Sequence, residues 1–350
     1  MPGLDGLRAI AVMAVILYHL EVGLAPGGLL GVAVFFTLSG YLITDILLEG
    51  WVSRKLSLKE FWLARARRLL PALLVMLAVV LLWIWIGDPD QLDSLRGETI
   101  SSIFFVENWW AIGQDMSYFD RFGAPSPMSH LWSLAVEEQF YLVWPVLFVA
   151  GTTKLGNRRF LWAILGGIVA STALMWLLFT PGTDPTRVYY GTDTRAAGLL
   201  IGSALAMVWP AWRLRDTPTR SGRVVIDLIG LVSLGYLLWA FATVGEFDSS
   251  LYRGGFLVVG LASAGVIVAA VHPASRLGGR ATEGSPAVWA SLANPVLHWV
   301  GLRSYGLYLW HWPFVAAAAS LAKVGTGGPE TLPAQWGVLA VLVSVVPAWL

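Results

Sequence analysis

The sequence of 350 residues contains no cysteine, and only 13% of its residues are charged. Without cysteine the chain has no disulfide, no thiolate nucleophile and no cysteine-ligated metal. A soluble domain carries about 25% charged residues, so this chain has too little polar surface to cover itself in water. A formal net charge of +1 excludes the concentrated basic face that nucleic-acid binding requires.

Several motifs of known chemistry are also missing. The sequence has no Walker loop, dinucleotide fingerprint, nucleophile elbow or cluster of metal ligands, so no metal cofactor is predicted. No small-residue cleavage site follows the first apolar run, which favours a retained membrane helix over a signal peptide. Nothing in the sequence specifies an oligomeric state.

Apolar residues make up 57% of the chain and are gathered in long runs. Those long enough to cross about 30 Å of hydrocarbon lie at 7–24, 29–49, 69–87, 130–150, 160–180, 194–211, 224–244, 254–271, 298–321 and 335–350. The predicted fold class is therefore all-α, a polytopic membrane protein with about ten transmembrane helices. A further run, 100–112, is too short and contains Glu107 and Asn108, which is typical of a re-entrant or interfacial segment.

The distribution of basic residues supports this topology. Fifteen of the 23 Lys and Arg residues lie in four loops, 50–68, 151–159, 212–223 and 272–297. Basic loops stay cytoplasmic, and these four share one side only if 100–112 does not cross. We therefore predict a multi-pass plasma-membrane protein with both ends cytoplasmic. We also expect a short amphipathic helix at 57–63 on the inner leaflet, and a chain that continues beyond Leu350.

The first apolar run contains Arg8 and, eleven residues later, His19. Eleven helical steps place both side chains on one face, about 16 Å apart along the axis. Ionisable groups inside a membrane cost about 2.5–3.5 kcal/mol and usually face a protein interior or a wet cavity. The alternative is that Arg8 reaches the lipid headgroups and His19 packs against a neighbouring helix.

The run at 130–150 contains two adjacent carboxyl groups, Glu137 and Glu138. Ser133 and Tyr141 share a helical face with Glu137. Helical rise places Glu137 about 10 Å and His19 about 8 Å below the outer ends of their helices, so we expect them to meet. The structural alternative is a protonated Glu137 that is hydrogen-bonded within the bundle.

Other polar residues allow two interpretations each. Arg65 and Arg68 lie at the inner surface, where they suit a ligand with several phosphates or, alternatively, lipid headgroups. Ser39 and Gly40 favour close helix packing.

Two groups lie further along the chain. His311 is near mid-membrane with Tyr308 one turn away, either as a reactive pair or as packing. Arg195 stands where its helix leaves an outer loop, as a substrate contact or an interfacial anchor.

In this order, these residues resemble acyltransferase family 3, the integral membrane O-acyltransferases that modify bacterial surface polysaccharides, peptidoglycan, glycolipids and some antibiotics. The resemblance covers one membrane-embedded domain, 1–350. No extracytoplasmic hydrolase-like domain, which some members carry, is visible. The matching motifs are Gly6-Leu7-Arg8 with His19, Phe35-Phe36 through Ser39-Gly40-Tyr41-Leu42-Ile43, Arg65 to Pro71, Trp132-Ser133-Leu134 with Glu137 and Gln139-Phe140-Tyr141, Arg195, and Ser304-Tyr305 through His311-Trp312-Pro313.

The resemblance implies transfer of an acyl group, expected to be acetyl, from cytoplasmic acyl-CoA to a hydroxyl of an envelope glycan or glycolipid. It implies that His19 acts as general base or acyl carrier and that Glu137 orients its imidazole. Position 138 is often aromatic in the family, which favours Glu137 over its neighbour. The implied binding residues are Arg8, Arg65 and Arg68 for the CoA phosphates, and Arg195, Tyr308 and His311 for the substrate.

A proton-coupled secondary transporter of a sugar or lipid is the alternative function, since buried Glu, His and Arg also form proton relays. Such transporters carry inverted repeats and paired broken helices, and the sequence has neither. A membrane scaffold without chemistry leaves the intramembrane polar residues unexplained. Membrane lipids are expected to surround the protein in any of these cases.

Overall fold

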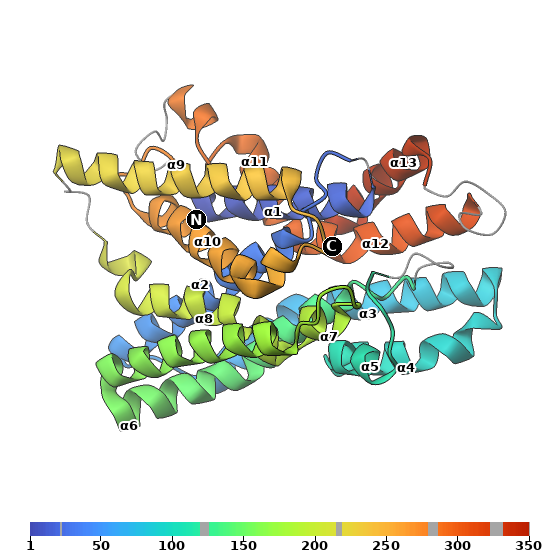
Figure 1. Ribbon diagram of the computed structural model, residues 1–350, viewed down its shortest axis with the longest axis horizontal. Helices are drawn as coiled ribbons and strands as arrows, with labels where there is room; N and C mark the ends of the chain where they lie inside the picture. The colour runs from blue at the N-terminus through green and yellow to red at the C-terminus, as the bar shows by residue number, and fades with distance from the viewer. Residues whose placement is uncertain (22, 120–125, 215–218, 279–285, 323–331, 350) are drawn as a thin grey trace.

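The computed structural model describes residues 1–350 except 22, 120–125, 215–218, 279–285, 323–331 and 350. Within this part of the chain every regular element is helical, which confirms the all-α class (Figure 1). The long helices are α1 (Pro2–His19), α2 (Leu30–Val52), α3 (Leu58–Gly87), α6 (Leu131–Leu178), α8 (Thr192–Val208), α9 (Arg220–Thr243), α10 (Phe256–Val271) and α12 (Ser304–Leu321). The short ones are α4 (Gln91–Ile103), α5 (Glu107–Gly113), α7 (Thr186–Tyr190), α11 (Pro295–Leu302) and α13 (Ala334–Val345), with the turns η1 (Ala211–Arg213), η2 (Leu251–Gly255), η4 (Pro286–Ala290) and η5 (Pro347–Trp349).

The predicted count of about ten membrane-spanning helices is not confirmed. Six described helical stretches are long and apolar enough to cross a membrane: Leu30–Val52, Leu58–Gly87, Leu131–Leu178, Thr186–Arg213, Ser221–Thr243 and Leu251–Val271. One reason is that α6 joins two predicted spans into a single helical stretch of 48 residues, with a break at Gly156 (φ 72°). Another is that α13 has only 12 residues.

Two predicted membrane-surface segments have different outcomes. The expected short helix at 57–63 is wrong as a separate element, because α3 continues without interruption from Leu58 through Pro71 to Gly87. Arginine and leucine are good helix formers, so the basic stretch carries on the helix rather than ending it. The run at 100–112 is divided between α4 and α5, and neither is among the six candidate spans, in agreement with the prediction.

Helix α2 lies at the centre of the fold and packs against α1, α6, α8 and α10. Its closest neighbour is α8, where glycines allow the two backbones to touch. A Cβ atom on Gly40 would lie 1.8 Å from the carbonyl oxygen of Leu199, and one on Gly202 would lie 2.0 Å from that of Thr37. Small residues at such crossings are typical of helices in membranes, so the packing role predicted for Gly40 is confirmed.

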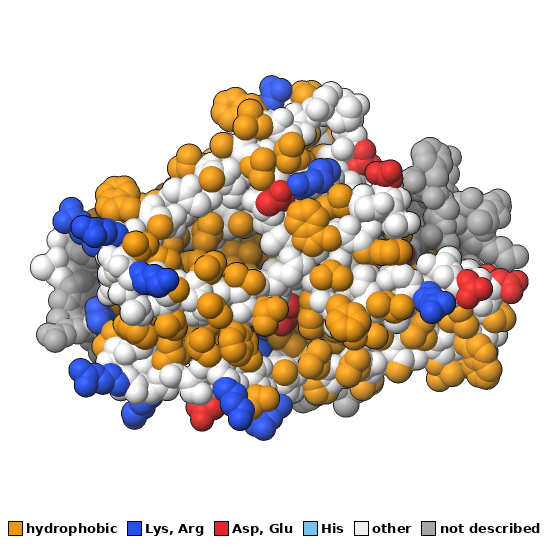
Figure 2. Space-filling view, turned by 90° about the horizontal axis from the view of Figure 1, so that it is seen from below, with side chains coloured by type: hydrophobic (Ala, Val, Ile, Leu, Met, Phe, Trp, Pro, Cys, Tyr) orange, Lys and Arg blue, Asp and Glu red, His pale blue; other side chains and the backbone are white. Residues whose placement is uncertain are grey.

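The outer surface is largely apolar. Figure 2 shows hydrophobic side chains over the middle of one face, and Lys and Arg gathered mainly toward one end. Leu177, Val232 and Ile86 are more than two-thirds exposed, which suits contact with lipid chains rather than water. Parts of two of the four basic loops lie outside the described residues, namely 215–218 of the loop 212–223 and 279–285 of the loop 272–297.

Candidate active site

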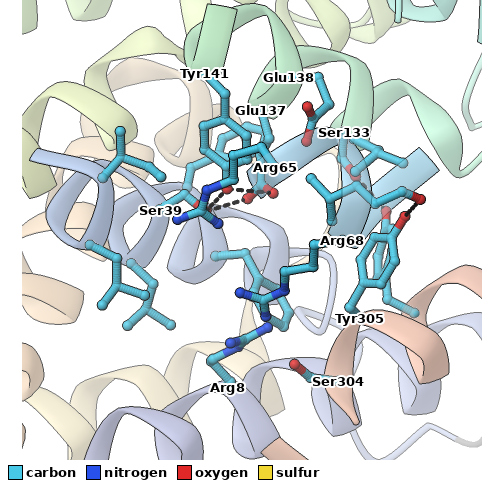
Figure 3. A pocket seen from close by; sticks show the side chains of 18 of the residues that line it. Arg8, Ser39, Arg65, Arg68, Ser133, Glu137, Glu138, Tyr141, Ser304 and Tyr305 are labelled. Carbon is cyan, nitrogen blue, oxygen red and sulfur yellow. Dashed lines mark hydrogen bonds between the residues drawn. The ribbon is translucent and has the colours of Figure 1, made fainter. Parts of the chain in front are cut away.

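A cavity of about 220 Å³ opens between α1, α2, α3, α6 and α12. One side of its lining is apolar, with Leu42, Ile43 and Ile46 of α2 and Leu69 of α3. The polar lining residues are Arg8, Ser39, Arg65, Arg68, Ser133, Glu137, Glu138, Tyr141, Ser304, Tyr305 and Tyr308 (Figure 3). The structure therefore brings together five of the eight predicted site residues: Arg8, Arg65, Arg68, Glu137 and Tyr308.

Three arginines converge on this cavity from two helices. Arg8 comes from α1, and Arg65 and Arg68 come from successive turns of α3. Arg65 lies over the ring of Tyr141, with 5.3 Å between the guanidinium carbon and the ring centroid. Arg8 and Arg68 repel one another, and among the described residues none of the three makes an ion pair. Such a cluster of cations favours an anionic ligand.

Glu137 belongs to this arginine-lined cavity. Ser39 Oγ donates a hydrogen bond to Glu137 Oε1 (2.9 Å), and Tyr141 donates to both Ser39 Oγ (2.9 Å) and Glu137 Oε2 (3.4 Å) (Figure 3). The carboxylate also interacts electrostatically with Arg8 and Arg65. Ser39 is thus a polar partner of Glu137 in addition to the packing role predicted for it.

His19 has other partners than the Glu137 expected from the sequence. Its Nδ1 lies 2.9 Å from His311 Nε2, and its Nε2 lies 3.0 Å from the hydroxyl of Tyr118. Arg8 lies about 16 Å back along α1 and shares the cavity with Glu137. The depth estimate from the sequence fails because it takes the helix to end at Leu24, whereas α1 ends at His19.

The hydrogen bonds of the two histidines determine which nitrogens carry protons. His311 Nδ1 lies 2.6 Å from the carbonyl oxygen of Tyr308, and a carbonyl can only accept, so Nδ1 carries the proton. In a neutral pair His311 Nε2 then accepts from His19 Nδ1, which leaves a lone pair on His19 Nε2. Burial raises the pKa of the Tyr118 hydroxyl well above its usual range, so Tyr118 keeps its proton and donates to that lone pair.

Tyr308 stands between the cavity and the histidine pair. It lines the cavity, and its ring lies 5.5 Å from that of His311. Its hydroxyl donates to the carbonyl oxygen of His130 (2.9 Å) and lies 2.6 Å from Ser133 Oγ. We call Tyr308 and Ser133 the hydroxyl wall, since both line the cavity and Tyr308 lies between it and His311.

Arg195 is buried rather than interfacial, so the anchor interpretation is wrong. It is 3% exposed, in the first turn of α8. Among the described residues, its Nε, Nη1 and Nη2 have no hydrogen-bond partner. Its guanidinium carbon instead faces four aromatic rings, with centroid distances of 3.9 Å to Phe256, 5.1 Å to Tyr189, 5.4 Å to Phe36 and 5.9 Å to Trp132.

Sequence reasoning missed two groups at the site. Tyr118 lies in the irregular segment between α5 and α6, where no helical period indicates which way a side chain points. Trp312 packs on His19 with ring centroids 4.6 Å apart; it belongs to the motif that ends at Pro313, but no role was predicted for it. No group of three His, Cys, Asp or Glu side chains that could hold a metal ion occurs in the described part of the chain.

The chain is similar to known bacterial proteins over nearly its whole length. The model of the acyltransferase domain family matches residues 1–350. The peptidoglycan O-acetyltransferase OatA of Listeria monocytogenes is 45% identical over 326 residues, 93% of this chain and 51% of the relative. The putative peptidoglycan O-acetyltransferase YrhL of Bacillus subtilis is 42% identical over 352 residues, 99% of this chain and 53% of the relative.

The putative O-acetyltransferase SAS0844 of Staphylococcus aureus is 40% identical over 320 residues, 90% of this chain and 51% of the relative. The chain thus spans about half the length of the curated relatives it matches. No solved structure matches it. The whole-length match to the family model, together with these identities, shows that the chain belongs to acyltransferase family 3.

Proposed function

We propose that this protein transfers an acetyl group from cytoplasmic acetyl-CoA to a hydroxyl of a cell-envelope glycan. We place it in the plasma membrane, with the arginine-lined end of the cavity toward the cytoplasm. The relatives named as peptidoglycan O-acetyltransferases make peptidoglycan the first acceptor to test. The observation that carries the proposal is one continuous arrangement: three arginines, then the cavity, then Tyr308, then His311 and His19.

The donor would enter with its phosphates at Arg8, Arg65 and Arg68. Arginine binds phosphate through paired hydrogen bonds and keeps its charge at any cellular pH. The pantetheine arm spans roughly 15–20 Å when extended, from ordinary bond lengths. That length is comparable to the rise of about 16 Å from Arg8 to His19. The arm is therefore long enough to bring the thioester to the histidine pair while the nucleotide stays at the membrane surface, once it displaces the Tyr308 and Ser133 hydroxyls that lie between.

His19 would act as the general base through its Nε2. The acceptor hydroxyl takes the position of the Tyr118 hydroxyl, and its proton moves to His19 Nε2 as its oxygen attacks the thioester carbonyl. The carbon–sulfur bond breaks, the ester forms, and the thiolate of CoA recovers the proton. His311 holds His19 in the required tautomer, as the third group of a catalytic triad does.

Two further residues would assist the transition state. Tyr308 lies at the end of the cavity, where its hydroxyl would turn from the carbonyl oxygen of His130 to donate to the developing oxyanion. Arg195 lies behind the aromatic layer of Tyr189 and Trp132 and adds positive potential there. We therefore propose that Tyr308 stabilises the oxyanion of the reacting carbonyl and that Arg195 helps to position the acceptor.

The test uses the purified protein in lipid nanodiscs with acetyl-CoA and a short peptidoglycan fragment. Release of free CoA together with ester formation is the expected result, and His19→Ala should abolish both. Glu60→Gln, which alters an exposed carboxylate outside the cavity, is the control. A wild-type protein that carries glycan across a vesicle membrane and cleaves no thioester would be a transporter instead.

A further inference from the structure

A second cavity, of about 330 Å³, adjoins the first at Arg68 and Tyr305, which line both. Tyr305 is fixed between the two by a hydrogen bond from its hydroxyl to the carbonyl oxygen of Leu69 (3.0 Å). The second cavity also receives Arg303, the residue directly before α12. Four of its lining residues, Arg68, Tyr305, Gly306 and Trp310, belong to the sequence motifs, whereas Arg303 does not.

The start of α12 supplies several groups that favour an anion. Arg303 is held over the ring of Trp299, with the guanidinium carbon 4.3 Å from the centroid, and its Nη1 donates to the Trp299 carbonyl oxygen (3.1 Å). Ser304 is completely buried, lines the first cavity, and its Oγ has no hydrogen-bond partner among the described residues (Figure 3). The first-turn N–H groups of this 18-residue helix add positive potential.

The first cavity alone is small for a donor that carries a nucleotide. Pockets for drug-sized ligands measure about 300–1,000 Å³, and the first cavity alone, at about 220 Å³, is smaller than that. The two cavities together fall within the range. A donor that consists of a nucleotide with several phosphates and a slender arm fits such a pair, with the arm along the apolar side of the first cavity and the phosphates shared between its arginines and the second cavity.

We infer that the second cavity binds part of the donor's phosphate groups, between Arg68 and Arg303, while the others stay at Arg8 and Arg65 and the pantetheine arm passes Tyr305 into the first cavity. This inference rests on the proposed function, since it takes acetyl-CoA as the donor. It adds Arg303 and the first turn of α12 to the donor site. Arg68, which lines both cavities, bridges the two parts of the ligand.

The test compares two donors, acetyl-CoA and S-acetyl-pantetheine, which lacks the nucleotide and its phosphates. Arg303→Ala should raise the KM for acetyl-CoA about tenfold, because a hydrogen bond to a charged group is lost, and leave the KM for S-acetyl-pantetheine unchanged. Unchanged turnover of the short donor also shows that the variant is folded. Arg303→Lys should recover part of the acetyl-CoA affinity, since charge returns without the planar guanidinium.

Arg213→Ala is the matched control, because Arg213 also lies over a neighbouring tryptophan, 4.5 Å from the Trp212 ring, but lines neither cavity. An anionic lipid headgroup would offer the same phosphate chemistry, so the assays are run in phosphatidylglycerol and in phosphatidylcholine nanodiscs. An Arg303→Ala effect that is equal for both donors, or present only with phosphatidylglycerol, would overturn the inference. A wild-type protein that cleaves neither donor would instead contradict the proposed function.

Discussion

Nδ1 of His19 lies 2.9 Å from Nε2 of His311, although 292 residues separate them in the chain. This contact joins the C-terminal end of α1 to the middle of α12. In the proposed mechanism, His311 takes the orienting role that the family resemblance implied for Glu137. The candidate catalytic pair is therefore two imidazoles, and Glu137 lies with the arginines.

The histidine pair is expected to act as one unit. His311→Gln should lower kcat about 10²–10⁴-fold, the usual contribution of general-base catalysis, because His19 loses its orienting partner. The Kd for CoA should not change. The double variant with His19→Ala should be hardly slower than His19→Ala alone. His298→Gln, which alters a histidine paired with Asp5 (3.2 Å) outside the cavity, is the control and should retain activity.

Glu137 should affect donor binding. Glu137→Gln keeps the hydrogen bond from Ser39 but removes a negative charge from a cavity that receives phosphates, so CoA should bind severalfold more tightly. His19→Ala should leave the Kd for CoA unchanged. Isothermal titration at two salt concentrations measures both, and the gain should shrink at high salt. A Glu137→Gln protein with unchanged CoA affinity would contradict this assignment.

The α3 arginines allow a comparison within one helix. Arg65→Ala and Arg68→Ala should each raise the KM for acetyl-CoA about tenfold, since both line the cavity, while kcat changes less. Arg67→Ala is the matched control, because Arg67 belongs to the same basic stretch but lines neither cavity. Equal effects at all three positions would indicate a general role in membrane insertion.

The crossing of α2 and α8 is expected to tolerate no side chain at Gly40. Gly40→Ala would place a methyl group 1.8 Å from the Leu199 carbonyl oxygen, so the helices must separate. The yield of folded protein in detergent and its thermal midpoint should both fall. Gly235→Ala in α9 is the control, since nothing lies within 4 Å of the added atom, and it should be neutral or slightly stabilising.

Glu107 in α5 should make stability depend on pH. It is 1% exposed, its Oε2 has no partner among the described residues, and burial raises its pKa well above the usual range. The folded state therefore holds a proton that the unfolded state loses above about pH 4.3, and stability falls as pH rises from there toward the folded pKa. Glu107→Gln should raise the thermal midpoint at pH 7 and lose this advantage below pH 4. The exposed Glu60→Gln should show no such difference.

Helical periodicity allowed much of the site to be predicted. Arg8 and Glu137 were expected to face the protein interior because charge is rare inside a membrane, and Arg65 and Arg68 were expected to suit a ligand with phosphates as part of an arginine cluster; all four line one cavity. The contacts between helices could not be predicted, and the expected pairing of His19 with Glu137 is absent among the described residues. The depth of a residue below the membrane surface was counted along its helix, which requires known helix ends and no tilt, and α1 ends earlier than its apolar run.

Other features depend on structure that leaves no periodic signal. Tyr118 lies in an irregular segment, and its approach to His19 follows from the packing of α6 and α7 around it. The position of Arg195, where a helix leaves a loop, is typical of an interfacial residue. Its guanidinium nevertheless lies among four aromatic rings that come from α2, α6, α7 and α10. Only the assembled fold shows that these rings enclose it.

The hydroxyl wall has a consequence for the energy balance of the cell. An enzyme that works across a membrane must not become a leak for protons and other ions, because these carry the membrane potential. Ser133 Oγ and the Tyr308 hydroxyl lie 2.6 Å apart and both residues line the arginine-lined cavity, so no water molecule fits between the two hydroxyls. In the proposed reaction the donor arm must displace this hydroxyl pair to reach His19, and the return of the pair after each turnover would limit the leak of ions through the cavity.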